Sequence, residues 1–268
     1  MKTFKDKVAV ITGGASGMGR ATALSLAREG VSVAIADLNE ERLAATAGEL
    51  EALGVRAIGV RCDVSRPEDI TELRRQALER LGRVDILMNN AGVLPLGRFE
   101  STPLSEWERA LRVNFLSAVV GVQTFLPDLE ATGDGHVVNT ASIAGAFAYE
   151  PATMAYNTSK AAVIALSEGL ALALAPRGIG VTCLLPGPVA TNIMEQARPS
   201  GPIAQLATYA TANFEMRTAE EVGEMVVEAI RTNRFFLPTN ENLNDILQRR
   251  AMDPDGFVAE MKAHLAQG

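Results

Sequence analysis

The sequence predicts an α/β fold in which a doubly wound parallel sheet carries helices on both faces. Short apolar runs rich in β-branched residues alternate with segments of helical period along most of the chain. The apolar runs show little polar alternation, which is typical of strands buried on both faces. A glycine-rich segment directly after the first run opens a helix. Because strand–helix alternation requires right-handed crossovers, we expect the strands to be parallel.

The composition indicates a folded globular protein. The chain has 268 residues, and we expect one domain over residues 1–268 with a sizeable core. Hydrophobic residues make up 47% of the chain, which is far from a disordered composition. The net charge of −7 argues against a nucleic-acid partner, since such a partner requires a basic patch. Cys62 and Cys183 occur in apolar, strand-like contexts and are expected to be buried, reduced thiols.

The apolar stretches do not predict a membrane segment. The run Val8–Ile11 is too short for a signal peptide. The run Ala161–Ala175 is interrupted by Ser167 and Glu168, so we expect a buried helix there. We therefore expect no membrane partner and a cytoplasmic protein.

The pattern places the elements in alternating order. Strands are expected at Lys7–Ile11, Ser32–Ala36, Arg56–Val60, Asp85–Met88, Gly135–Thr140 and Gly180–Leu184. Helices are expected at Met18–Glu29, Glu40–Leu53, Glu68–Leu81, Ser105–Leu126 and Tyr156–Ala175. Capping boxes are expected to begin helices at Ser105-x-x-Glu108 and Thr218-x-x-Glu221. Helix C-caps are expected at Gly30, Gly54 and Gly82.

The last part of the chain is less regular. Residues 193–214 show no clean period. A helix near Ala219–Arg231 and a final strand at Arg234–Leu237 are expected. The tail from Glu241 to Gly268 has an amphipathic helical pattern, and it could cover the substrate site or extend an interface.

The glycine-rich turn after the first strand is typical of a phosphate-binding site in a Rossmann-type sheet. Its glycines permit positive φ and close backbone approach, and the helix N-terminus offers free N–H groups to a pyrophosphate. The generic spacing G-x-G-x-x-G is not met, because Thr22 stands at the third position. The dinucleotide-contacting residues expected here are Gly13, Ser16, Gly17, Met18 and Gly19.

An acidic residue at the end of the second strand favours NAD over NADP. Asp37 follows the turn by roughly 20 residues, where a carboxylate binds the adenosine ribose hydroxyls. A carboxylate there repels the additional phosphate of NADP, and neither Ala15 nor Leu38 offers a cation to bind it. Asp63, after the third strand, is a weaker candidate of the same kind.

Tyr156 and Lys160 are candidates for acid–base chemistry. Their spacing of four places both side chains on one helix face. The ordinary tyrosine pKa is about 10, and a cation about 4 Å away could lower it by roughly three units. Such a pair is common on helices, but Ser142 and the segment Asn89–Gly92 follow strands whose ends meet at one sheet edge. Asn114 alone is best explained as a satisfied helix amide.

Taken together, these motifs resemble the short-chain dehydrogenase/reductase family. The chain resembles it over roughly the first 190 residues, and the glycine spacing that departs from the generic fingerprint is the family's own. The motifs that carry the resemblance are Thr12-Gly13-x-x-x-Gly17-x-Gly19, Asn89-Asn90-Ala91-Gly92, Asn114, Ser142, Tyr156-x-x-x-Lys160 and Pro186-Gly187.

The resemblance implies a role for each matching residue. Tyr156 would be the general acid/base, Lys160 would lower its pKa and bind the nicotinamide ribose, and Ser142 would hydrogen-bond the substrate oxygen. Asn114 would hold a water in a proton relay with Lys160. Further cofactor contacts are implied for Asp63, Val64, Asn90, Ala91, Gly92, Pro186, Gly187, Val189 and Thr191. The implied fold is a central sheet of about seven parallel strands.

The resulting hypothesis is an NAD-dependent enzyme that interconverts a secondary alcohol and a ketone. No metal is expected, because the histidines and cysteines lack ligand spacing. Two alternatives stay open: an NADP-dependent reductase of the 3-oxoacyl type, and a dinucleotide-binding regulator without catalysis. The complete set Ser142, Tyr156, Lys160 and Asn114 argues against the regulator.

A mostly apolar substrate pocket is expected under a lid at residues 191–216. Apolar residues in and near that segment favour a hydrophobic, cyclic or aromatic alcohol, although they could equally pack the lid itself. These residues are Leu94, Ala144, Phe147, Tyr149, Met154, Ile193, Met194, Ile203, Leu206, Tyr209 and Phe214. Glu150 is a candidate polar contact, but a surface position is expected. The apolar helix Tyr156–Ala175, with the helix before it, predicts a homodimer or homotetramer.

Overall fold

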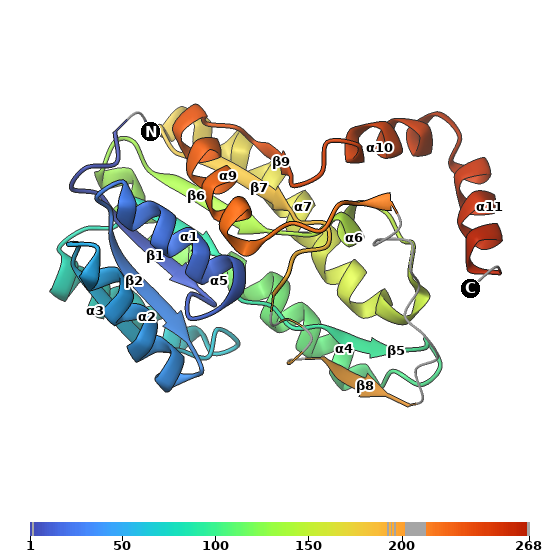
Figure 1. Ribbon diagram of the computed structural model, residues 1–268, viewed down its shortest axis with the longest axis horizontal. Coiled ribbons are helices and arrows are strands. Elements are labelled where there is room, and N and C mark those ends of the chain that lie inside the picture. Colours follow the sequence, from blue (N-terminus) through green and yellow to red (C-terminus); the bar gives the residue numbers. More distant parts are fainter. Residues whose placement is uncertain (2, 192, 194, 196, 202–212, 267–268) are drawn as a thin grey trace.

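A seven-stranded parallel sheet forms the centre of the molecule (Figure 1), in the order β3-β2-β1-β4-β6-β7-β9. The computed structural model describes residues 1, 3–191, 193, 195, 197–201 and 213–266. The strands are β1 Val8–Thr12, β2 Ser32–Asp37, β3 Ala57–Arg61, β4 Ile86–Asn89, β6 His136–Thr140, β7 Gly180–Leu185 and β9 Phe236–Pro238. This architecture confirms the predicted doubly wound sheet.

Helices cover both faces of this sheet (Figure 1). One face packs against α1 Gly17–Arg28, α2 Glu40–Ala52 and α9 Ala219–Thr232. The other packs against α3 Pro67–Leu81, α5 Ser117–Ala131 and α7 Met154–Leu174. Successive strand residues face opposite cores, because side chains alternate along a strand: Ala9 and Ile11 point to the first core, Val8 and Val10 to the second.

A third apolar cluster lies beside the site and contains the C-terminal tail. The tail forms α10 Leu243–Met252 and α11 Pro254–Leu265, which are coloured red in Figure 1. Phe257 of α11 meets Phe147 edge-to-face at 5.6 Å between ring centroids. Phe147 directly follows the short helix α6 Ile143–Ala146, so the tail supports the wall that begins at Ser142.

The predicted helix Ser105–Leu126 is a longer, composite helix. It consists of α4 Leu104–Ala110, the π-helical turn η1 Leu111–Leu116 and α5. The expected cap at Ser105 is wrong, because Pro103 already occupies the N-cap position and Ser105 lies in the first turn. The capping box at Thr218 and Glu221 is confirmed.

Two further differences concern strands and exposure. A small parallel pair, β5 Pro95–Gly97 with β8 Arg198–Ser200, was not predicted, because each strand has three residues and lacks an apolar period.

By length and composition, Leu104–Ala131 and Pro151–Arg177 could cross a membrane, a criterion that core helices also meet. The expectation of a buried helix at Ala161–Ala175 is wrong, because only 28% of the most apolar window of Pro151–Arg177 is buried.

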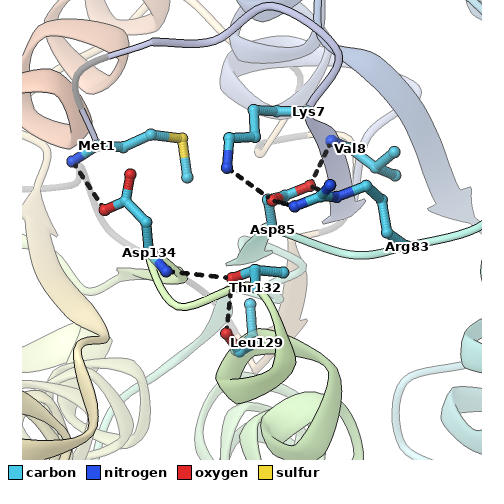
Figure 2. Close-up of polar contacts among 8 residues, drawn as sticks. All are labelled: Met1, Lys7, Val8, Arg83, Asp85, Leu129, Thr132 and Asp134. Atoms are coloured by element: carbon cyan, nitrogen blue, oxygen red, sulfur yellow. Dashed lines mark hydrogen bonds and ion pairs between the residues drawn. The ribbon is translucent and has the colours of Figure 1, made fainter.

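A buried carboxylate, that of Asp85, holds together the amino-terminal ends of the central strands β1 and β4 (Figure 2). The fully buried Asp85 accepts hydrogen bonds from Lys7 Nζ at 3.1 Å, from the Val8 backbone N–H at 3.0 Å and from two Arg83 guanidinium nitrogens. The Met1 ammonium pairs nearby with Asp134 at 3.5 Å. These contacts stabilise the edge opposite the site, where β1 and β4 begin.

Candidate active site

A cavity of about 510 Å³ opens at the carboxyl ends of the strands. It lies where the strand order reverses between β1 and β4, the usual ligand site of a doubly wound sheet. The cavity runs from Asp37 and Asp63 at one end to Ser142 and Tyr156 at the other. One cavity is therefore lined both by residues predicted from the sequence to bind the cofactor and by residues predicted to carry out the proton transfer.

The first βα turn is packed too tightly for side chains. A Cβ at Gly19 would lie 2.2 Å from the Gly13 carbonyl oxygen, and one at Gly17 would lie 3.2 Å from the Thr191 side chain. Gly13 has a φ of 62°, which glycine adopts without steric cost. Helix α1 begins at Gly17, after Ser16, so its N-terminal N–H groups face the cavity.

Asn90 ties this turn to the neighbouring strands. Its Nδ2 donates to the carbonyl oxygens of Thr12 at 3.1 Å and Gly13 at 3.2 Å. Its Oδ1 accepts from the Thr140 hydroxyl at 3.2 Å. The backbone N–H of Asn90 and that of Ala91 both donate to the Thr12 hydroxyl. One side chain thus positions the ends of β1, β4 and β6 relative to each other.

Two carboxylates mark the far end of the cavity. Asp37 ends β2 and accepts from the backbone N–H groups of Leu38 at 2.8 Å and Asn39 at 3.2 Å. Asp63, just after β3, accepts from the Ser65 hydroxyl at 2.7 Å. Both side chains are held by local backbone turns, which leaves them beside the space where an adenosine would lie.

Ser142, Tyr156 and Lys160 meet at the other end. Ser142 is the N-cap of α6, where its Oγ accepts from the Ala144 N–H at 3.1 Å. Tyr156 lines the cavity beside Ser142, whose side chain acts to lower the pKa of Tyr156. Lys160 Nζ donates to the Thr140 carbonyl oxygen at 2.6 Å and lies 5.8 Å from the Tyr156 ring centroid. Because Tyr156 and Lys160 occupy one face of α7, the strand end β6 and this helix together assemble the triad.

The expected electrostatics of Tyr156 need a correction. Burial of the hydroxyl raises the pKa of Tyr156, and the hydrogen bond with Ser142 lowers it less. Burial likewise lowers the pKa of Lys160 to about 8. The expected lowering of the Tyr156 pKa required a cation about 4 Å away, but desolvation disfavours the charged forms of both Tyr156 and Lys160. In the structure the desolvation effect is the larger one.

Asn114 lies behind the cavity wall, in the π-helical turn η1. Its Oδ1 accepts from Val93 N–H at 2.8 Å, and its Nδ2 donates to the Val93 carbonyl oxygen at 3.0 Å and to Ser159 Oγ at 2.9 Å. A Cβ at Gly92 would lie 3.4 Å from Asn114 Oδ1 and 3.6 Å from Lys160 Nζ. Such π-helical turns are frequent at functional sites, and the proton relay through Asn114 stays a prediction.

The other predicted cofactor contacts fall into two groups. Gly19 shapes the turn from behind, as Asn114 does for the wall, and neither lines the cavity. The residues that line it are Gly13, Ser16, Gly17, Met18, Asp37, Asp63, Val64, Asn90, Ala91, Gly92, Pro186, Gly187, Val189 and Thr191.

The substrate end agrees with the expected pocket only in part. Leu94, Ala144, Tyr149 and Ile193 line it, whereas Phe147 and Phe214 are buried in the third cluster behind it. Met154 does not line the described cavity. Four of the apolar residues expected to line the pocket from the lid lie outside the described residues: Met194, Ile203, Leu206 and Tyr209.

Several lining residues were not predicted from sequence, including Ile143 and Thr153. The expectation of a surface position for Glu150 is wrong, since it is 9% exposed and lines the cavity. The position before Pro151 is a helix-start signal that points to this placement: Glu150 caps the 3₁₀ turn η2 Pro151–Thr153, and that turn holds its side chain inward.

Comparison with known proteins agrees with this geometry. A family model described as short chain dehydrogenase matches residues 7–201. The 2,5-dichloro-2,5-cyclohexadiene-1,4-diol dehydrogenase LinX of Sphingobium indicum is 35% identical over 193 residues, which cover 72% of this chain and 77% of that protein.

Solved structures share the fold at similar levels of identity. A short-chain dehydrogenase/reductase from Burkholderia phymatum in complex with NAD has a TM-score of 0.85 and 34% identity, with 95% of this chain and 96% of that chain covered. A blue fluorescent protein from a metagenomic library in complex with NADPH has a TM-score of 0.80 and 26% identity, with 90% and 99% covered. The two complexes hold different forms of the cofactor.

The variant Lys160→Met is expected to unfold at higher urea concentration than the wild type at pH 7, although it loses turnover. The pKa of Lys160 is about 8 in the folded protein and 10.5 ordinarily. Holding the charged amine therefore destabilises the fold by about 3 kcal/mol, and losing the bond to Thr140 offsets part of the gain. We expect a net increase of about 1 to 2 kcal/mol in the free energy of unfolding.

The pH dependence of this difference checks its cause. Between pH 8 and 10.5, the unfolded chain keeps a proton at Lys160 that the folded chain has lost. Wild-type stability should therefore rise relative to K160M across this window. Measuring both proteins cancels the titration of all other groups. A K160M protein less stable than the wild type at pH 7 would contradict the claim that the buried charge of Lys160 destabilises the fold.

Proposed function

The chain belongs to the short-chain dehydrogenase/reductase family, and from that premise we propose that it is an NAD-dependent oxidoreductase that interconverts a hydrophobic, cyclic secondary alcohol and the corresponding ketone. The observation that carries the proposal is a single cavity with catalytic candidates at one end and cofactor-binding candidates at the other. Ser142, Tyr156 and Lys160 meet at one end, and a phosphate-binding turn followed by Asp37 stands at the other.

The cavity residues fit a dinucleotide. Gly17 and Gly19 are closely packed and have no side chains. The backbone N–H groups at the start of α1 would therefore face a bound pyrophosphate directly. Asp37 would hold the adenosine ribose, and Lys160 the nicotinamide ribose. When bound, a nicotinamide dinucleotide supplies or accepts the hydride.

The protein's own residues handle the proton. In oxidation, Tyr156 as phenolate accepts the proton of the substrate hydroxyl; in reduction, its hydroxyl returns a proton to the carbonyl oxygen. Ser142, which lines the cavity beside Tyr156, holds the substrate oxygen next to it. The cationic Lys160, fixed by Thr140, favours the phenolate against the desolvation that opposes it. Burial of these groups also excludes bulk water from the proton transfer.

Three observations support the substrate and cofactor assignments. The walls near Ser142 include the apolar side chains Leu94, Ala144 and Ile193, which suit a hydrophobic ring. LinX, by its name, acts on a cyclohexadiene diol. The choice of NAD rests on Asp37, whose carboxylate repels the additional phosphate of NADP.

Replacement of the proposed acid/base tests the mechanism. Tyr156→Phe removes one hydroxyl and should lower kcat with cyclic secondary alcohols about 10³-fold, a typical contribution of general acid–base catalysis. NADH binding, measured by fluorescence titration, should stay within threefold. Thr158→Val removes an exposed hydroxyl from the same helix and serves as the matched control. Near wild-type turnover in Y156F would exclude the mechanism and revive a non-catalytic dinucleotide-binding role.

The cofactor assignment predicts a kinetic preference. The wild type should have a kcat/KM for NAD at least about 100-fold above that for NADP, because the additional phosphate would meet the Asp37 carboxylate while Arg42, the cation that interacts with Asp37, is paired with Glu195 at 2.9 Å. Asp37→Asn keeps the shape and removes the charge, and it should raise kcat/KM for NADP about tenfold. Asp245→Asn, on exposed α10, is the control. A wild-type preference for NADP would instead support a reductase of the 3-oxoacyl type.

The exposed apolar faces of α7 and of the composite helix α4–η1–α5 support a homo-oligomer. Leu172 is 80% exposed and Leu116 is 47% exposed, so a second copy of the chain could bury both. Wild-type protein at micromolar concentration should scatter light as a dimer or tetramer. Leu172→Asp should shift it toward monomer, whereas Val258→Asp on α11 should not. A monomeric wild type would overturn this assignment.

A further inference from the structure

The substrate end of the cavity contains a carboxylate to which the proposed reaction gives no role. Glu150 lies between α6 and α7 and lines the cavity together with Tyr149 and Thr153. It is 9% exposed, an uncommon degree of burial for a glutamate. A carboxylate in such a place is expected to act on whatever enters the cavity.

The backbone holds Glu150 in a defined position relative to Tyr156. Its Oε1 accepts from the Ala152 N–H at 2.8 Å, and its carbonyl oxygen accepts from the Thr153 hydroxyl at 2.9 Å. Asn157 Nδ2 also donates to that carbonyl at 3.5 Å. Since Asn157 is the neighbour of Tyr156 on α7, the backbone of Glu150 is tied to the helix that carries the proposed acid/base, and the Ala152 N–H holds the carboxylate itself.

The charges around the cavity are unevenly distributed between its ends. Its acidic lining residues are Asp37, Asp63 and Glu150. Asp37 ends β2 and Asp63 comes just after β3, so Glu150 supplies the acid at the substrate end. Among the described lining residues the cation is Lys160, and its Nζ donates to the Thr140 carbonyl oxygen. A substrate that enters this end therefore meets a negative charge set between apolar walls.

We propose that Glu150 selects the substrate: it accepts a hydrogen bond from a second hydroxyl group on a neutral cyclic alcohol, and it excludes alcohols that carry a carboxylate or phosphate. The proposal rests on the proposed function and names its substrate class as cyclic diols and hydroxyketones. One oxygen of the substrate meets Ser142 and Tyr156, and the other meets Glu150. Hydrogen bonds to a charged acceptor are stronger than neutral ones, more so in an apolar cavity.

A matched set of substrates tests the selection. The probes are cyclohexanol, cis- and trans-1,2-cyclohexanediol and trans-1,4-cyclohexanediol, with 2-hydroxycyclohexanecarboxylate as the anion. For the wild type with NAD, kcat/KM for the best diol should exceed that for cyclohexanol about tenfold or more, the effect of one charged hydrogen bond. The carboxylate should be the poorest substrate. This comparison needs no variant, so it stands even if a substituted protein fails to fold.

Glu150→Gln then assigns the selection to this side chain. It keeps the size of the side chain and its oxygen acceptor but removes the charge. The ratio of kcat/KM for the best diol to that for cyclohexanol should fall at least about fivefold, and the same ratio for the carboxylate substrate should rise about tenfold. Glu224→Gln, an exposed change on α9, should keep both wild-type ratios.

The possible failures are distinguishable. Equal wild-type kcat/KM for cyclohexanol and the diols, or unchanged ratios in E150Q, would overturn the role of Glu150 while Tyr156-dependent turnover upheld the proposed function. Turnover of these alcohols that survives in Y156F would overturn the proposed function itself. A wild type that prefers the carboxylate substrate would overturn the selection outright.

Discussion

The hydrogen bonds of Asn90 are the interaction on which the site depends. Its amide joins the carbonyl groups of Thr12 and Gly13 to the Thr140 hydroxyl, and so joins the carboxyl ends of β1, β4 and β6. The Thr140 carbonyl in turn receives Lys160. A continuous chain of contacts therefore runs from the phosphate-binding turn to the proton-handling residues, and the two ends of the cavity are kept in one geometry.

Buried polar groups play different roles at the amino-terminal and carboxyl-terminal ends of the strands. At the amino-terminal ends of the strands, the fully buried Asp85 carboxylate pairs with the part-exposed side chains of Lys7 and Arg83, and these contacts hold the strand starts together. At the carboxyl edge, Lys160 and the Tyr156 hydroxyl are buried where desolvation disfavours their charged forms. Groups whose pKa values are shifted by burial in this way are typical of sites that move protons.

The substrate end depends on parts of the chain that are distant in sequence. Phe147 follows the wall that begins at Ser142, and its ring lies against Phe257 from the C-terminal helix α11. Glu150 is turned inward by the 3₁₀ turn that precedes α7. These contacts explain why the tail, which has no recognisable motif, belongs to the same cluster as the site. They also explain why apolar composition alone did not separate pocket residues from the residues packed behind them.

Local spacing allowed the sequence by itself to determine much of this protein. Strand and helix periods predicted the sheet and its order of elements. A spacing of four put Tyr156 and Lys160 on one helix face, and the glycine turn followed by Asp37 marked the dinucleotide end. These features follow from backbone geometry over a few residues. Only the tertiary structure decided that Glu150 is buried, that β5 pairs with β8, that Asn114 lies in a π-helical turn, and that burial raises rather than lowers the pKa of Tyr156. Each of these depends on desolvation or on partners far along the chain, which no local pattern contains.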